Sequence, residues 1–99
     1  MRTPIHPGVI LGEELRELDM SCSALAEAID VVPNRITQIV SGKRDITADT
    51  ALRLGRFFDM SADFWMNLQK TYELDLARRQ HGREIERIKP HAKQAVASV

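Results

Sequence analysis

The segment Ser21–Arg44, SCSALAEAIDVVPNRITQIVSGKR, decides the fold, because it predicts two short amphipathic helices joined by a tight turn. Ser21 is a good N-cap for the first helix. Leu25 and Ile29 lie at i, i+4 on one face of that helix, and Ala26 between them is small enough for close contact with a neighbour. The first helix therefore has one apolar face to bury.

The second helix of this segment begins at Pro33, whose missing N–H costs nothing in a first helical turn. Asp30 supplies the turn before it, because Asp tolerates the left-handed backbone conformation better than most residues. Ile36, Ile39 and Val40 form the inner face at i, i+3, i+4. Two helices in this spacing predict a helix-turn-helix with the second helix as the recognition helix.

Four polar residues lie on the outer and lateral faces of the recognition helix: Asn34, Arg35, Thr37 and Gln38. Asn and Gln can bond adenine bidentately and Arg can bond guanine, each pair giving about 1–3 kcal/mol of discrimination. A solvated helix face is the plain alternative for such a set. The helix-turn-helix spacing favours contacts with base edges in a DNA major groove.

Cations and helix ends around this segment suit contacts with phosphates. Gly42 is a natural stop for the recognition helix, and Lys43 and Arg44 follow it with no acid between Asn34 and Arg44. Ser21 and Cys22 begin the scaffold helix, whose first N–H groups can face a phosphate. A local cationic patch matters more here than the formal net charge of zero.

Helical spacing continues on both sides, so we predict an all-α, five-helix domain over residues 1–77, followed by a C-terminal helical extension and frayed tail over 78–99. A first helix runs from Pro7 and a fourth is capped by Thr47, with Asp49 in its first turn. Ser61 caps the fifth. The apolar positions are Leu11, Leu15 and Leu18, then Ala51, Leu54 and Phe58, then Trp65, Leu68, Tyr72 and Leu76.

Glycines punctuate the later helices. Gly55 inside the fourth helix costs about 1 kcal/mol relative to Ala, which predicts close approach by a neighbouring helix. Gly82 is expected to end or weaken the fifth helix, with Ile85 and Ile88 in a short further turn before Pro90.

Composition excludes several other classes of protein. The chain has 99 residues and one cysteine, so an intramolecular disulfide is impossible. Its three histidines are far apart, and neither a metal site nor a nucleophile–base pair is visible, so we expect no cofactor and no enzyme. No apolar run approaches the roughly 20 residues of a membrane span, and the N-terminus lacks the apolar run of a signal peptide. A cytoplasmic protein is the expectation.

The segment Ser21–Arg44 resembles the helix-turn-helix of the lambda-repressor-like (Xre) regulators. The flanks resemble the HigA branch of that family, the VapI-like addiction-module antitoxins, through His6-Pro7-Gly8, Ile10-Leu11, Glu14-Leu15, the run Ser41–Leu54, Phe57-Phe58, Ser61, Phe64-Trp65, Asn67-Leu68-Gln69 and Tyr72. The similarity covers roughly residues 5–77. The chain departs from the family pattern at Val9, Cys22, Asp30 and Val32.

The resemblance implies a dimeric antitoxin that binds a palindromic operator in double-stranded DNA, represses its own operon and neutralises a HigB-like toxin, an mRNA-cleaving ribonuclease. The DNA-binding positions that it carries over are Asn34, Arg35, Thr37, Gln38, Lys43 and Arg44. A stand-alone regulator of the same fold, without a toxin, is the alternative. Nothing catalytic carries over.

An aromatic stripe on the fifth helix admits two interpretations. Phe64, Trp65, Leu68 and Tyr72 form either core or a dimer interface, and one stripe can serve both. Cys22 at a helix N-terminus suits a redox sensor, although a tolerated small side chain is the simpler interpretation. The basic tail after Ala77 is interleaved with acids, which favours a solvated face.

Overall fold

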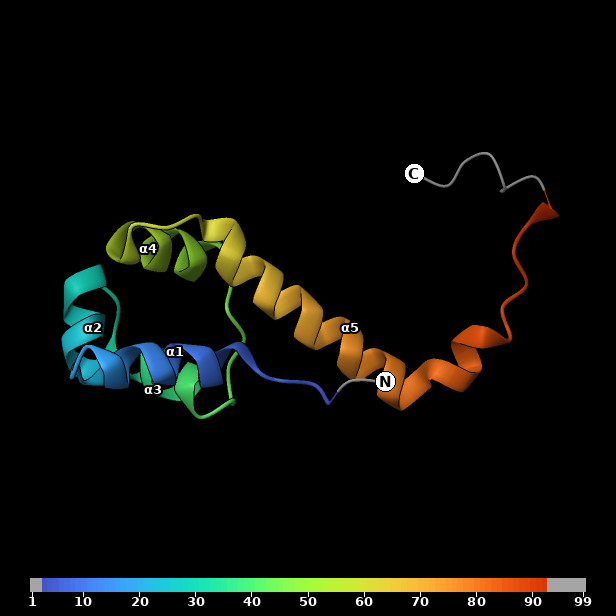
Figure 1. The fold of residues 1–99 in the computed structure, drawn as a ribbon, viewed down its shortest axis with the longest axis horizontal. Helices are drawn as coiled ribbons and strands as arrows, with labels where there is room; N and C mark the ends of the chain where they lie inside the picture. Colours follow the sequence, from blue (N-terminus) through green and yellow to red (C-terminus); the bar gives the residue numbers. More distant parts are fainter. Residues whose placement is uncertain (1–2, 93–99) are drawn as a thin grey trace.

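A computed structural model describes residues 3–92, and within them five helices and no strand (Figure 1). The all-α, five-helix prediction is confirmed. The helices are α1 (Pro7–Glu17), α2 (Cys22–Ile29), α3 (Pro33–Val40), α4 (Ala48–Phe58) and α5 (Ala62–Glu86). Most of the predicted frayed tail, residues 93–99, falls outside the described residues.

Three predicted hydroxyl caps begin helices as expected. Ser21 Oγ accepts the Ala24 N–H at 3.0 Å, and Ser61 Oγ accepts the Asp63 N–H at 3.0 Å. Thr47 caps α4 through the Thr50 N–H in the same way. Each side chain satisfies an N–H group that has no partner inside its helix.

The turn after α2 also forms as predicted. Asp30 has φ 59° and ψ 52°, in the left-handed region, and its N–H closes the end of α2. Asp19 and Asp59 adopt the same conformation after α1 and α4, with φ of 53° and 54°. Three aspartates therefore end three helices, because a short polar side chain tolerates this backbone better than most.

The core lies where α1, α2, α3, α4 and the first turns of α5 meet. Its buried apolar side chains are Leu11, Leu15, Leu25, Ala26, Ile29, Ile36, Ile39, Ile46, Ala51, Leu54 and Trp65. Full burial of one such Leu or Ile is worth about 1.5–3 kcal/mol. Leu18 was predicted here wrongly: it is 53% exposed, because α1 ends at Glu17 and the chain turns away from the core.

Two glycines allow close backbone contact between elements. A Cβ at Gly8 would overlap the Ile39 carbonyl, so α1 and α3 touch through their backbones. A Cβ at Gly55 would lie 2.7 Å from the Met60 carbonyl oxygen and 3.0 Å from the Ala62 nitrogen. The close approach predicted at Gly55 is therefore real, and it comes from the turn that leads into α5.

Helix α5 is 25 residues long and extends well beyond the other four helices (Figure 1). Its first half packs on α4 and α1, whereas its second half projects away from them. The radius of gyration is accordingly 17.0 Å, against about 13 Å for a compact domain of this length. No helix in residues 3–92 has the length and apolarity to cross a bilayer.

Gly82 was expected to end or weaken α5, and the first of these is wrong, because the helix does not end there. The helix continues through it to Glu86, and Ile85 belongs to this helix rather than to a separate turn. A single interior glycine costs about 1 kcal/mol, and the surrounding Arg, Gln and Glu residues are good helix formers. Ile88 follows the helix and is exposed.

Candidate DNA-binding surface

The helix-turn-helix is formed by α2, the turn Asp30–Val32 and α3. The Val31 N–H donates to the Ala26 carbonyl at 3.0 Å, which turns the chain sharply out of α2. Val32 is the N-cap of α3 but its side chain cannot accept a hydrogen bond, and Pro33 occupies the first helical position. Buried residues of both helices fix their relative orientation.

The recognition helix presents three of its four predicted contact residues on its accessible side. Asn34 and Thr37 are exposed, and Gln38 is half-buried. The Thr37 hydroxyl donates to the Pro33 carbonyl at 3.2 Å, which leaves its lone pairs as acceptors. Asn34 and Gln38 lie four residues apart, one helical turn, so α3 can offer both amides to neighbouring bases.

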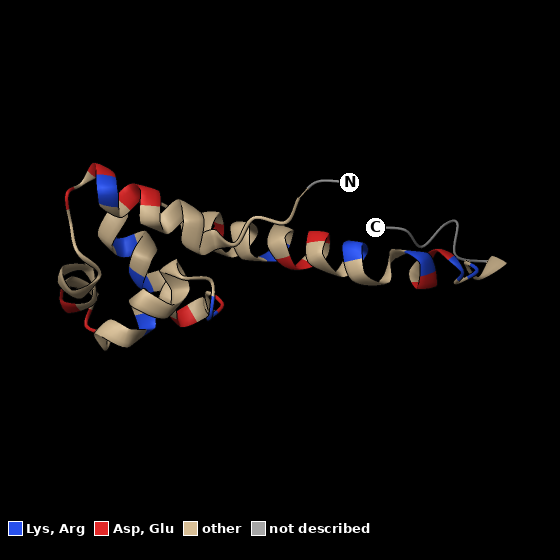
Figure 2. Cartoon of the chain, turned by 90° about the horizontal axis from the view of Figure 1, so that it is seen from below, with Lys and Arg blue, Asp and Glu red and all other residues tan. Residues whose placement is uncertain are grey.

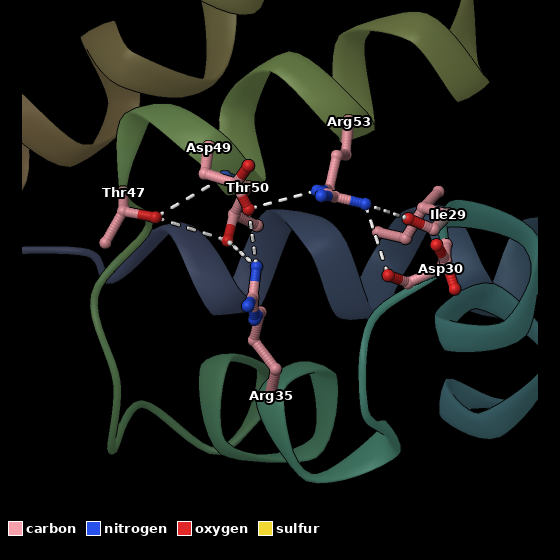
Figure 3. A network of polar contacts seen from close by, with 7 residues as sticks. All are labelled: Ile29, Asp30, Arg35, Thr47, Asp49, Thr50 and Arg53. Carbon is pink, nitrogen blue, oxygen red and sulfur yellow. Dashed lines mark hydrogen bonds and ion pairs between the residues drawn. The ribbon is translucent and has the colours of Figure 1, made fainter.

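Arg35 lies apart from the other three and points from α3 toward the first turn of α4 (Figure 3). Its Nη1 donates to Asp49 Oδ2 at 2.7 Å and to Thr50 Oγ1 at 3.4 Å. Its side chain is 29% exposed. The sequence placed Asp49 correctly in the first turn of α4 but gave no sign of this pair, which forms across 14 residues.

Asp49 binds a second arginine, and this one reaches α2. Arg53 Nε donates to Asp49 Oδ2 at 3.0 Å, and Arg53 Nη1 donates to the carbonyls of Ile29 and Asp30 at 2.8 and 3.2 Å (Figure 3). The hydrogen bonds from Arg35 and then from Arg53 lower the pKa of Asp49. The carboxylate thus joins α3 to α4, and Arg53 joins α4 to the C-terminal end of α2, where a cation is favoured.

The loop after α3 carries the two predicted phosphate contacts, Lys43 and Arg44, both exposed. Gly42 has φ 81°, and the Lys43 N–H donates to the Gln38 carbonyl at 2.8 Å, which closes the end of the helix. Across the molecule acidic and basic residues are interleaved, including along the projecting half of α5 (Figure 2). The loop is therefore a local cationic feature on a balanced chain.

The N-terminus of α2 also presents its predicted residues at the surface. Ser21 is exposed and Cys22 is half-buried. Because Ser21 Oγ already accepts the Ala24 N–H, the groups left for a phosphate are the other first-turn N–H groups.

Two residues that were not predicted as part of the site lie against the segment between α3 and α4. Gln69 of α5 is only 2% exposed; its Oε1 accepts the Ile46 N–H at 2.8 Å and its Nε2 donates to Glu73 at 2.8 Å. His6 caps α1 by accepting the Gly8 N–H at 2.9 Å on Nδ1, and its Nε2 lies 3.8 Å from Asp45. Gln69 lies at i+4 from Trp65, a spacing that places it on the buried face.

The aromatic stripe of α5 divides between core and surface. Trp65 is fully buried, with ring centroids 5.8 Å from Phe58 and 5.1 Å from Phe64. Phe64 itself is 40% exposed. Leu68 and Tyr72 are half-buried, and the Tyr72 ring meets the His6 ring edge-on at 4.9 Å. The core interpretation therefore holds for Trp65, and the accessible surface comes from the other three.

Known proteins resemble this chain over most of its length. The helix-turn-helix family (HTH_3) matches residues 11–65. Virulence-associated protein I of Dichelobacter nodosus is 53% identical over 74 residues, which are 74% of this chain and 68% of that protein. An addiction module antidote protein of the HigA family from Coxiella burnetii superposes with a TM-score of 0.88 at 49% identity, over 92% of this chain and 100% of the other.

A third relative has been solved on DNA. The Pseudomonas aeruginosa antitoxin HigA, in a structure with the higBA promoter, is 50% identical with a TM-score of 0.85, over 89% of this chain and 98% of the other. The residues that match the helix-turn-helix family, 11–65, include α2 and α3. The chain therefore belongs to the helix-turn-helix family and, within it, to the HigA antitoxins of addiction modules.

Proposed function

We propose that this chain binds the operator of its own operon as a homodimer, represses that operon, and neutralises a HigB-like ribonuclease toxin. The observation that carries the proposal is the exposed polar side of α3 followed directly by Lys43 and Arg44. The promoter-bound HigA of Pseudomonas aeruginosa supports it at 50% identity.

The proposed division of labour follows from the side-chain chemistry. Asn34 and Gln38 read adenine edges, and Thr37 contacts a base or a thymine methyl group. Lys43 and Arg44 bind phosphates, as do the first N–H groups of α2 at Ser21 and Cys22. Phosphate contacts set the register of the protein on the duplex, whereas the α3 amides select the sequence.

The proposed dimer forms through α5. Its accessible apolar side chains include Phe64, Leu68 and Tyr72 near the core and Leu74 farther along. A two-fold dimer would place two copies of α3 about 34 Å apart, one turn of DNA, on a palindromic operator. Residues from about 78 onward form an extension beyond the DNA-binding domain.

A gel shift on the DNA upstream of the gene, with random DNA as competitor, tests operator binding. The shift should resist competitor and weaken steeply with salt. Co-purification with the product of the adjacent gene, followed by an mRNA-cleavage assay, tests the antitoxin role. Cleavage that stays unaffected by an equimolar amount of this chain would support the stand-alone regulator instead.

A further inference from the structure

Arg35, Asp49 and Arg53 form a continuous clamp that joins three helices (Figure 3). Asp49 of α4 accepts from Arg35 of α3 at 2.7 Å and from Arg53 at 3.0 Å. Arg53 then reaches the Ile29 carbonyl of α2 at 2.8 Å. The scaffold and recognition helices are thus tied to the same turn of α4 by charged groups, in addition to their apolar contacts.

We propose that the Arg35–Asp49–Arg53 clamp sets the orientation of the recognition helix on DNA and lowers non-specific binding, with Arg35 as a positioning residue rather than a base reader. The inference rests on the proposed operator binding. From the sequence alone, Arg35 was expected to hydrogen-bond the edge of a guanine.

The geometry gives the first reason. The Nη1 group of Arg35 is held by two acceptors on α4, the Asp49 carboxylate and the Thr50 hydroxyl, which ties the guanidinium to the first turn of that helix. Hydrogen bonds between ionised partners are about twice as strong as neutral ones. Asn34, Thr37 and Gln38 face no such competition from a carboxylate in the contacts of the described residues. Arg35 is the one cationic side chain of α3, and Asp49 and Thr50 already bind it.

Charge gives the second reason. The Asp49 carboxylate pairs with two guanidinium groups and offsets one of their two positive charges. If Asp49 were neutral, Arg35 would lose its ionic partner and could bind phosphates of any sequence, whereas Arg53 would keep its bonds to the Ile29 and Asp30 carbonyls. Non-specific affinity grows with the number of phosphates neutralised. The clamp thus favours the contacts already proposed, which come from the polar side of α3, the loop after it and the first N–H groups of α2.

The exposure of the clamp makes this role separable from stability. Asp49 is exposed and Arg35 is part-exposed, and ion pairs of this kind contribute little to folding. Hydrogen bonds to bases, in contrast, weaken steeply as distance and angle depart from ideal values. A loosened α3 should therefore lose discrimination between DNA sequences while the fold persists.

The test measures Kd on the operator and on random DNA across a salt series, together with Tm, for the full chain and for Asp49→Asn. We expect the ratio of specific to random affinity to fall about tenfold or more, a loss comparable to one base contact. Random-DNA affinity should rise, and the salt slope should steepen by about one, for the freed Arg35.

Asp63→Asn is the matched control. Asp63 is also an exposed aspartate in the first turn of a helix, α5, and its removal changes the charge by the same amount. It should leave the affinity ratio unchanged. Asp49→Glu, which keeps the charge, should restore much of the ratio lost in Asp49→Asn.

Arg53→Gln is the second variant, and it keeps the Arg35–Asp49 pair while cutting the link to α2. It should also lower the affinity ratio without increasing random-DNA affinity. An unchanged ratio in both Asp49→Asn and Arg53→Gln overturns the proposal. So does an Arg35→Ala variant whose preference relaxes at a single base pair only, since that pattern marks a base reader. A wild-type chain that fails to distinguish operator from random DNA overturns the proposed function as well.

Discussion

Single side chains on and after α3 fall into two kinds of proposed DNA contact, which can be separated by substitution. Gln38→Ala should cost about 1–3 kcal/mol on the operator and relax the preference at one base pair, because it removes a bidentate contact. Lys43→Ala should weaken operator and random DNA alike and flatten the salt slope by about one. Binding titrations on both DNAs measure the two effects. Equal losses on both DNAs for Gln38→Ala would remove it from the base-reading set.

Gly8 and Gly82 should respond oppositely to the same substitution. Gly8→Ala places a methyl group against the Ile39 carbonyl, so α1 must move from α3 and the free energy of unfolding should fall by about 1–3 kcal/mol. Nothing lies within 4 Å of a Cβ at Gly82, and Gly82→Ala should stabilise by about 0.5–1 kcal/mol. Urea denaturation gives both values. Stability unchanged in Gly8→Ala would mean that the two backbones are not in contact.

At single positions, local rules predicted the helix caps and turns but not the contacts between helices. Ser21, Asp30 and Thr47 were predicted correctly, because capping and left-handed turns depend on the residue and its immediate neighbours. The partner of Arg35 was not predicted, because Asp49 comes close only after α3 and α4 have packed. Gln69 lies on the buried face that helical spacing indicates, but its bond to the Ile46 N–H, 23 residues away, was missed for the same reason.

Among the helices, α5 shows where the spacing of apolar residues predicts a helix and where it does not. Its apolar stripe predicted the packed half through Leu76, where side chains meet α1 and α4. Beyond that point no residue of α5 is buried by the part of the chain that the structure describes, so the sequence offered only Gly82 as a boundary, and the helix does not end there. Helix propensity over the whole segment outweighed the cost of one glycine.

The contact between α3 and α4 should depend on pH through Asp49. In the folded chain the hydrogen bonds from Arg35 and Arg53 lower its pKa below the ordinary value of 3.8. The ionised clamp therefore contributes its full stability above the unfolded value and loses it as pH falls through the folded one. Urea denaturation from pH 7 to pH 2.5 gives the free energy of unfolding of wild type and of Asp49→Asn. The difference between these two free energies should be constant near neutrality and should decrease in acid. A difference that increases in acid would contradict this sign.

For the molecule as a whole, the accessible apolar part of α5 argues for a dimer. Light scattering should give a mass near twice the 11.2 kDa of the chain. Phe64→Glu should shift the mass toward the monomer, because it places a charge in the proposed interface. Leu52→Glu is the control, since Leu52 is an exposed apolar residue on α4, outside that surface. A monomer for the wild-type chain at micromolar concentration would count against two-fold operator binding.

The most direct test of the account is a footprint of this chain on the DNA upstream of its own gene, in the presence of excess random DNA. We expect protection of two half-sites whose centres lie about 34 Å apart, one helical turn, as two recognition helices of one dimer require. Protection that spreads over the fragment without half-sites, or that random DNA removes, would contradict the claim that α3 reads an operator.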